Sequence, residues 1–128
     1  WLAASGLAVT DDGFVKVDAH LRAVSDPRLF AVGDVAHMTA SPRPKAGVFA
    51  VRQGPVLNVA LRAALAGEEP PTYAPQGDYL RLISLGGKRA LALKYGVVAG
   101  GRGPLGALLW RLKDRIDRRF MADLDVAG

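Results

Sequence analysis

The chain has 128 residues, 50% of them hydrophobic, with 17 Lys and Arg against 12 Asp and Glu and a formal net charge of +5. It has no cysteine, which excludes disulfides, thiolate metal sites and Cys-x-x-Cys redox pairs within it. No apolar run approaches the roughly 20 residues of a membrane span, and the excess positive charge favours anionic partners. A chain of this length buries one core, so we expect one domain or pieces of two.

The first forty residues carry two strand patterns. Residues 14–18 alternate between apolar and polar side chains, which predicts a half-buried strand at a sheet edge. Residues 29–32 form a continuous apolar run after the turn signal at residues 26–27, a pattern typical of a parallel strand covered on both faces. Gly33 then allows a ligand to approach the backbone, and Asp34 would lie at the carboxyl end of the strand, where open α/β sheets bind ligands. The same pattern also occurs as a plain strand-to-loop turn.

A helix of about twenty residues is predicted over residues 46–65 from its density of Ala, Val and Leu. Pro44 suits the first helical position, and Gly67 provides a C-terminal stop. The pair Gly54-Pro55 predicts a kink or a break, because proline removes a backbone donor. We expect the helix to be largely buried. The residues available for burial are Val48, Val51, Val59, Leu61 and Leu65.

Three segments resemble a known family. Residues 30–36, Phe-Ala-Val-Gly-Asp-Val-Ala, look like the second FAD-binding motif of the pyridine nucleotide-disulfide oxidoreductase superfamily, in which the Asp hydrogen-bonds the ribityl chain. Residues 44–54 resemble the flavin-facing helix of NADH dehydrogenase-like members, and residues 110–121 are similar to the branch fused to selenide, water dikinase. The resemblance implies FAD as cofactor and NAD(P)H as co-substrate, with hydride passing to the flavin and electrons then passing to an unidentified acceptor.

The resemblance also implies a set of cofactor-binding residues. Gly33 and Asp34 would hold the ribityl region, and free N–H groups at the start of the helix would stabilise negative charge on the flavin. Val48 stands where other type II NADH dehydrogenases carry a Gln, so quinone is not implied as acceptor. No side chain is assigned as a catalytic acid or base, and no metal ligands are expected. The implied cofactor-binding residues are Gly33, Asp34, Lys45, Ala46, Gly47 and Val48. A buried structural helix without a ligand is the alternative.

The Gly-x-Gly-x-x-Gly spacing occurs only at Gly101, Gly103 and Gly106, after a predicted antiparallel strand, whereas the turns that usually seat FAD and NAD pyrophosphates follow a strand of a βαβ unit. The sequence also begins at Trp1 without an initiator Met. We therefore expect a C-terminal piece of a longer enzyme, inactive alone, whose first partner is the missing N-terminal FAD/NAD-binding portion. The expected location is cytoplasmic, with a peripheral position at the inner membrane as a further candidate.

The second half of the chain has a different pattern. Residues 80–85 and 89–95 read as two strands around a glycine turn, with residues 97–99 as a third strand. Gly103-Pro104 opens a last helix with one basic face and one apolar face. Its apolar face is expected to dock on the antiparallel sheet, with an anionic membrane surface as the alternative partner. The apolar face comprises Leu105, Leu108, Leu109, Leu112, Ile116 and Phe120.

These patterns predict an α+β fold. Residues 1–67 would be the C-terminal part of an FAD-binding α/β domain with short strands and a long helix, and residues 68–78, rich in proline and charge, a linker. Residues 79–128 would form a small antiparallel sheet and a C-terminal amphipathic helix. The alternative function is a non-enzymatic module for dimerisation, as a homodimer, or for membrane docking. Nucleic-acid binding is unlikely, because no recognition-helix motif or aromatic interleaving accompanies the charge.

Overall fold

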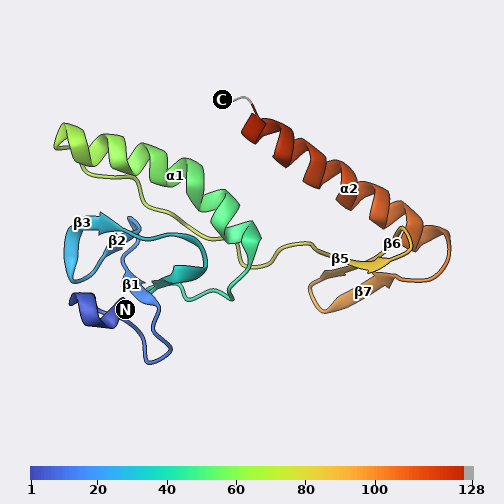
Figure 1. Cartoon of the computed structure of the whole chain (residues 1–128), viewed down its shortest axis with the longest axis horizontal. Coiled ribbons are helices and arrows are strands. Elements are labelled where there is room, and N and C mark those ends of the chain that lie inside the picture. The colour runs from blue at the N-terminus through green and yellow to red at the C-terminus, as the bar shows by residue number, and fades with distance from the viewer. Residues whose placement is uncertain (126–128) are drawn as a thin grey trace. The chain divides into compact units, whose positions relative to one another are not determined.

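The computed structural model describes residues 1–125 and their side chains up to residue 122. The chain divides into two compact units, Trp1–Gln76 and Gly77–Gly128 (Figure 1). Within residues 1–125 there are two α-helices and two sheets, of four and three strands, so the predicted α+β class is confirmed. The division between the units falls inside the proline-rich segment 68–78. In the described residues, no helix is long and apolar enough to cross a membrane.

The first unit contains a four-stranded sheet built from short strands. The strands are β1 (Val15–Val17), β2 (Arg22–Ala23), β3 (Asp26–Phe30) and β4 (Ala36–Met38), and their order across the sheet is β3-β2-β1-β4. β1 pairs with β4 in parallel, whereas the β1–β2 and β2–β3 pairs are antiparallel. The predicted strand at residues 14–18 therefore exists, but it is wrong as a sheet edge, because β1 has a neighbour on each side.

The core of the first unit lies on one face of this sheet. Val15 and Val17 are buried on either side of the half-buried Lys16, which confirms the alternation expected of a strand with one face packed. Leu21 in the β1–β2 turn is fully buried and has a left-handed backbone, with φ at 66°. The buried cluster comprises Val15, Val17, Leu21, Ala23, Ala36, Met38 and Tyr73.

The apolar run at residues 29–32 differs most from its prediction. It was expected to be a parallel strand covered on both faces, but β3 is antiparallel, lies at the sheet edge and ends at Phe30. Pro27 stands inside the strand, which an edge position allows because an outward-facing N–H is not needed there. Leu29 is 46% exposed. Instead of being covered, residues 29–32 line an open apolar hollow of about 470 Å³ together with Trp1, Leu2 and Leu7.

The long helix of the first unit, α1 (Gly47–Ala66), has 20 residues and confirms the predicted helix. It ends as expected at Gly67, whose N–H bonds the carbonyl oxygens of Ala63 and Ala64. The helix begins at Gly47, so the prediction that Pro44 occupies its first position is wrong. It also continues unbroken past Pro55, so the expected break is absent.

The prediction that α1 is largely buried is also wrong. Only one narrow face packs inward, because residues 49, 53, 56 and 60 recur at spacings of four and three on one side of a helix. Phe49, Gln53 and Ala60 are buried and Val56 is half-buried. The aliphatic side chains on the other faces of α1 are exposed in this unit. These are Val51, Val59, Leu61 and Leu65.

The second unit contains the predicted antiparallel sheet of three strands in sequential order. β5 (Arg81–Gly86) pairs with β6 (Arg89–Lys94), and β6 pairs with β7 (Val97–Gly100). Both connections are two-residue turns in which both residues have positive φ, 54° and 55° at Gly87 and Lys88 and 49° and 76° at Tyr95 and Gly96. Such turns match the twist of the paired strands, so local turn chemistry fixes the strand register here.

The last helix, α2 (Pro104–Asp125), packs against all three strands and begins at the predicted proline. The helix comes closest to the sheet and its following turn at small residues. A Cβ atom at Gly106 would lie 1.9 Å from the carbonyl oxygen of Gly101, and one at Gly100 would lie 2.5 Å from Cδ1 of Leu109. Leu112, expected to dock on the sheet, is 42% exposed. The predicted docking of α2 on the sheet is confirmed, and Leu109 of the predicted face takes part in it, but the other residues of that face are at least 42% exposed because the contact runs through Gly106 and Leu109.

Candidate functional site

The Gly33-Asp34 pair lies in a short 3-10 helix, η2 (Gly33–Val35), that packs beside α1. The N–H of Gly33 donates to Oε1 of Gln53 at 2.6 Å, and Gln53 is 4% exposed. A Cβ atom at position 33 would lie 3.2 Å from Cβ of Ala50. Gly33 also has φ at 68°, a left-handed conformation that favours glycine. Only a glycine therefore combines this turn with so close an approach to the helix.

η2 leaves the side chain of Asp34 exposed at the surface of the first unit. The turn is closed by the N–H of Ala36, which donates to the carbonyl oxygen of Gly33. Among the described residues, the Asp34 carboxylate has neither a hydrogen bond nor an ion pair. An exposed carboxylate that accepts no hydrogen bond from the protein can accept hydrogen bonds from hydroxyl groups of a ligand.

The start of α1 lies beside this turn without a side-chain cap. Ala46 precedes the helix with an extended backbone, and no acidic residue occupies the first turn. The first N–H groups of an α-helix have no partner within the helix, and the helix dipole adds a partial positive charge there. The N–H groups of Gly47 and Val48 therefore favour a negatively charged or strongly accepting group at this end of α1.

Lys45 is already bound by the protein. Its ammonium donates to the carbonyl oxygen of Ala36 at 2.5 Å and lies 4.0 Å from the centroid of the Phe14 ring. Loss of water around the ammonium lowers the pKa of Lys45, and the nearby Asp34 carboxylate partly offsets that change. Lys45 thus ties the start of α1 to the sheet and places positive charge near Asp34, rather than extending freely toward a ligand.

The turn and the helix start border one small hollow of about 20 Å³, enough for a single water molecule. Four of the predicted site residues line it, whereas Gly47 and Val48 lie outside its lining. A ring system as large as a flavin would therefore rest against this surface rather than enter it. The lining residues are Gly33, Asp34, Ala36, Met38, Arg43, Pro44, Lys45, Ala46, Phe49 and Gln53.

No protein-family model matches the chain, and no curated protein matches it significantly. The superfamily therefore stays a resemblance carried by the residues of the motifs.

Two residues of the site were missed in the sequence. Gln53 holds η2 through Gly33 and also places its Nε2 3.9 Å from Sδ of Met38. A signal for it existed, because Gln53 follows Phe49 by four residues and therefore falls on the same face of the helix as that buried ring. Arg43 also lines the hollow, and its Nε atom is buried without a hydrogen-bond partner. No spacing in the sequence singles out Arg43.

Tyr73 adds a second polar group that lacks a partner. The residue is 8% exposed, and its hydroxyl oxygen is buried without a hydrogen bond. Burial raises the pKa of Tyr73, while the positive charges of Arg52 and Arg43 act in the opposite direction. The hydroxyl therefore stays protonated at neutral pH and acts as an uncharged core group beside two guanidinium groups.

The two histidines do not form a metal site. In residues 1–125 no group of three His, Cys, Asp or Glu side chains could hold a metal ion. Nδ1 of His20 donates to the carbonyl oxygen of Pro70 at 2.6 Å, and its Nε2 lies 3.4 Å from Glu69. His20 therefore fastens the segment after α1 to the β1–β2 turn. His37 lies in β4, half-buried.

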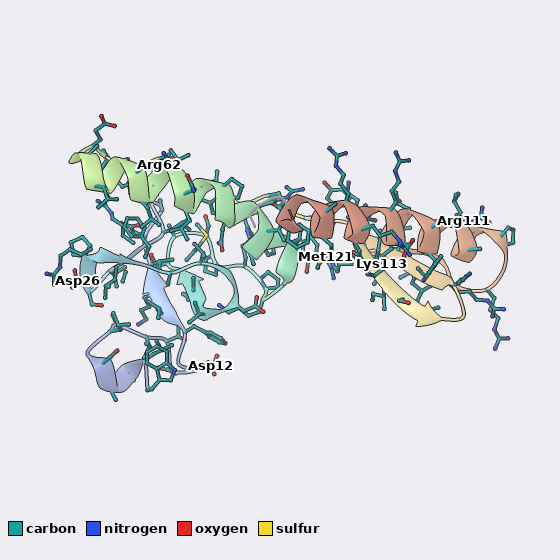
Figure 2. The ribbon with its side chains drawn as sticks, turned by 45° about the horizontal axis from the view of Figure 1, so that its top comes forward. Asp12, Asp26, Arg62, Arg111, Lys113 and Met121 are labelled. Carbon is teal, nitrogen blue, oxygen red and sulfur yellow. The ribbon has the colours of Figure 1, made fainter. Side chains whose placement is uncertain are left out.

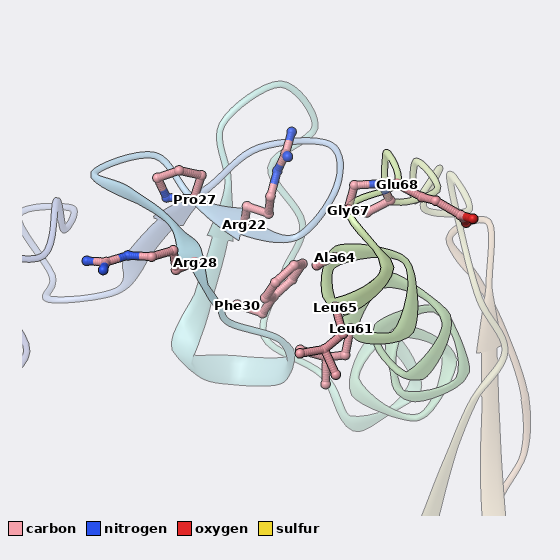
Figure 3. Close-up of a pocket in the computed structure, with 10 residues that line it drawn as sticks. Arg22, Pro27, Arg28, Phe30, Leu61, Ala64, Leu65, Gly67 and Glu68 are labelled. Atoms are coloured by element: carbon pink, nitrogen blue, oxygen red, sulfur yellow. The ribbon is translucent and has the colours of Figure 1, made fainter.

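A larger hollow of about 460 Å³ lies between β3 and the last turns of α1 (Figure 3). Phe30 lies between the strand and the helix, and the side chain of Arg28 points away from the hollow (Figure 3). Both arginines that line the hollow form ion pairs. Arg28 pairs with Asp26, and Arg22 pairs with Asp18 and Glu69. None of the predicted site residues lines this hollow, so it does not belong to the candidate site.

Proposed function

We propose that the chain is part of an FAD-dependent NAD(P)H oxidoreductase and that residues 1–67 are the C-terminal part of its FAD-binding α/β domain. The observation that carries the proposal is the hydrogen bond from the Gly33 N–H to Gln53 of α1. It joins the two segments that resemble flavin-binding motifs, and they border one hollow. A chance resemblance in each segment separately would not require the two segments to meet.

Each part of the site has a role in this proposal. The Asp34 carboxylate would accept hydrogen bonds from the ribityl hydroxyls, and the N–H groups of Gly47 and Val48 would stabilise negative charge on the flavin. Lys45 supports them from a distance, because its ammonium is held by Ala36 and Phe14. The flavin, when bound, supplies the redox chemistry, so no side chain here is needed as an acid or base.

The proposal also requires a further segment of protein. The one Gly-x-Gly-x-x-Gly spacing of the sequence, Gly101 to Gly106, follows the antiparallel strand β7, and the backbone of Gly101 packs against Gly106, so it does not form the βαβ turn that usually seats the pyrophosphate of FAD. The 20 Å³ hollow is too small to enclose a ring system. The N-terminal FAD/NAD-binding portion of a longer protein would supply the pyrophosphate cradle and the rest of the cavity. The open apolar hollow beside residues 29–32 is a surface for that portion to cover.

The test is Asp34→Ala in a longer protein that contains this chain. Loss of a charge-assisted hydrogen bond should weaken FAD retention by about 1.5 to 3 kcal/mol, measured as flavin bound per protein during dialysis. Asp12→Ala is the matched control, because Asp12 is an exposed acid of the first unit in a turn away from the site. The isolated 128-residue chain should purify colourless. Unchanged flavin content in Asp34→Ala would contradict the proposal, and stoichiometric flavin on the isolated chain would contradict the requirement for a further segment.

The second candidate is a non-enzymatic interaction module formed by residues 79–121. It is favoured by the exposure of large apolar side chains on both the sheet and the helix of the second unit, such as Ile83, Val98 and Leu108. The colour of a purified longer protein that contains this chain distinguishes the two candidates. A longer protein that purifies yellow supports the flavoenzyme, whereas a colourless one that associates through residues 79–121 supports the module.

A further inference from the structure

The first unit contains side-chain donors that the fold leaves without acceptors. Among the buried and half-buried side chains that the structure describes, three have a buried nitrogen or oxygen atom without a hydrogen-bond partner, those of Arg43, Tyr73 and Gln76. The nitrogen atoms of Arg43 and Gln76 can only donate, and the Tyr73 hydroxyl can donate as well. A buried donor without an acceptor costs free energy, so folded proteins usually supply one. What these side chains lack is therefore an acceptor.

Two guanidinium groups lie near the Tyr73 hydroxyl. Arg52 precedes Val56 by one helical turn, and Val56 packs against the buried cluster that contains Tyr73. Met38 of the same cluster lines a hollow together with Arg43. Burial raises the pKa of Tyr73 whereas the charges of Arg52 and Arg43 lower it, so both charges are close enough to act on the hydroxyl. Arg52 is exposed, so the group is open to solvent on that side.

The charge of these two arginines is not neutralised by a carboxylate. In the part of the chain that the structure describes, neither Arg43 nor Arg52 forms an ion pair or a side-chain hydrogen bond, unlike Arg22 of the same unit. Asp34 lines the hollow with Arg43, but the Lys45 ammonium near that carboxylate already offsets its charge. Two positive charges therefore remain beside one uncharged phenol. Their complement is an anion with two negative charges.

We propose that Arg43, Arg52 and the Tyr73 hydroxyl form a binding site for a small oxyanion with two charges, namely a phosphate group. A planar guanidinium donates parallel hydrogen bonds to phosphate oxygens, and the hydroxyl donates from the buried side. The exposed Arg52 side chain can move to admit the anion. The hollow beside Arg43 measures about 20 Å³, so only a small group can reach this position. None of these three residues belongs to the proposed flavin site.

The test titrates the 128-residue chain with inorganic phosphate at constant ionic strength and follows the amide NMR resonances. The amides of Arg52 and Tyr73 should shift with saturation, whereas added chloride should not shift them. Replacing both Arg43 and Arg52 by Gln should weaken binding roughly a hundredfold, because each charge-assisted contact contributes about tenfold. Phenyl phosphate is the second probe. Tighter binding of phenyl phosphate would identify a phosphorylated small molecule as the ligand, and tighter binding of inorganic phosphate would identify the free ion.

Tyr73→Phe separates a ligand site from a structural role, because it removes only the hydroxyl. That hydroxyl has no protein partner, so the variant should melt at or above the wild-type temperature in phosphate-free buffer. Its affinity for phosphate should nevertheless fall about tenfold, because one hydrogen bond to a charged group is lost. A hydroxyl that served only the fold would give the opposite pair of results, a lower melting temperature and an unchanged affinity.

Two matched controls test the position of these groups. Arg62 also lies on α1 (Figure 2), is exposed like Arg52, and donates from its Nε to Asn58. It follows Arg52 by ten residues, which is about 15 Å along the helix. Arg62→Gln should therefore change the affinity for phosphate less than threefold. Tyr95→Phe removes a hydroxyl from a tyrosine that is 76% exposed in the second unit, and it should leave the affinity unchanged.

Three results would overturn the proposal. The first is absence of saturable binding of phosphate, and the second is an equal loss of affinity in Arg62→Gln and in the double arginine variant. The third is a Tyr73→Phe variant that melts lower without phosphate and binds phosphate as the wild type does. Because no flavin takes part in the measurement, its failure would leave the flavoenzyme proposal standing. Unchanged flavin content in Asp34→Ala would likewise leave the oxyanion site standing.

Discussion

The two units of the chain differ in how their charge is arranged. Residues 1–76 carry seven basic and seven acidic residues, so the whole net charge of +5 belongs to residues 77–128. In the first unit several cations are bound by carboxylates or carbonyl groups, as Arg22, Arg28 and Lys45 show. In the second unit, Arg111, Arg115 and Arg119 of α2 have no carboxylate partner among the side chains described up to residue 122. Both units thus contain ion pairs, but basic residues outnumber acidic ones only in the second unit.

The units also differ in how they pack. The first unit buries β-branched and long side chains, with Val17 and Leu21 fully inaccessible. The second unit packs through small residues, Ala90 being fully buried where Gly100 and Gly106 let backbones approach. Small residues bury little apolar area, so the second unit gains less stability from its interior and depends more on each close contact. Its large apolar side chains stay outside that interior.

The largest effect is expected from filling the close contact in the second unit. In Gly106→Ala the added methyl group would collide with the backbone of Gly101, so we expect a loss of about 3 kcal/mol in the unfolding free energy of that unit. Gly54→Ala is the matched control, since apart from its chain neighbours nothing lies within 4 Å of its added methyl group; because Pro55 disfavours a helical residue with a Cβ atom before it, the change in stability should stay below about 1 kcal/mol. Urea unfolding followed by amide hydrogen exchange in each unit checks both. Equal effects of the two substitutions would contradict the conclusion that the second unit depends more on each close contact than the first.

A smaller effect is expected from the buried amide of the first unit. Gln53→Leu leaves the Gly33 N–H without its acceptor, which should cost about 2 kcal/mol and speed hydrogen exchange at Gly33. Gln53→Glu keeps an acceptor oxygen and should retain slower exchange at that amide. The second unit should be unaffected by either change. If Gly33 exchanged at the wild-type rate in Gln53→Leu, Gln53 would not be what holds the turn.

The smallest effect is expected from acid, and it acts on one carboxyl group in each unit. The Arg28 guanidinium lowers the pKa of Asp26 to about 2, and the N–H groups of Tyr95 and Tyr79 lower the pKa of Asp78. A carboxyl group with a lowered folded-state pKa stabilises the fold above its unfolded-state value, 3.8, and loses that contribution as the pH falls through the folded-state value. Stability should therefore decline below about pH 4.

Asparagine variants separate the two carboxyl groups in that titration. Asp26→Asn should reduce the loss of stability at acid pH in the first unit only, and Asp78→Asn should reduce it in the second unit only. Thermal melts across the acid range measure both. Both carboxyl groups are exposed enough that solvent keeps the effects small. If stability still declined steeply at acid pH in both variants, other carboxyl groups would be responsible.

Local sequence was sufficient for features that depend on near neighbours. Backbone preferences that operate within a few residues predict three of these features. They are the stop of α1 at Gly67, the start of α2 at Pro104 and the hairpin turn that contains Gly87. The alternation of β1 likewise predicts which of its side chains are buried. The sequence also identified the Gly33-Asp34 pair as a candidate site, because a glycine and an acid after an apolar run form a local pattern. The flavin assignment of that pair remains a prediction.

Only the tertiary structure decided which surfaces meet. The apolar run at residues 29–32 predicts a covered strand, but coverage depends on elements distant in sequence, and β3 lies at an edge. The periodicity of α2 identifies an apolar face, yet the sheet contacts Gly106 because only a residue without a side chain lets the backbones approach so closely. Gln53 reaches Gly33 across twenty residues of chain. Periodicity encodes which residues share a face, while close packing between separate elements selects the face that is buried.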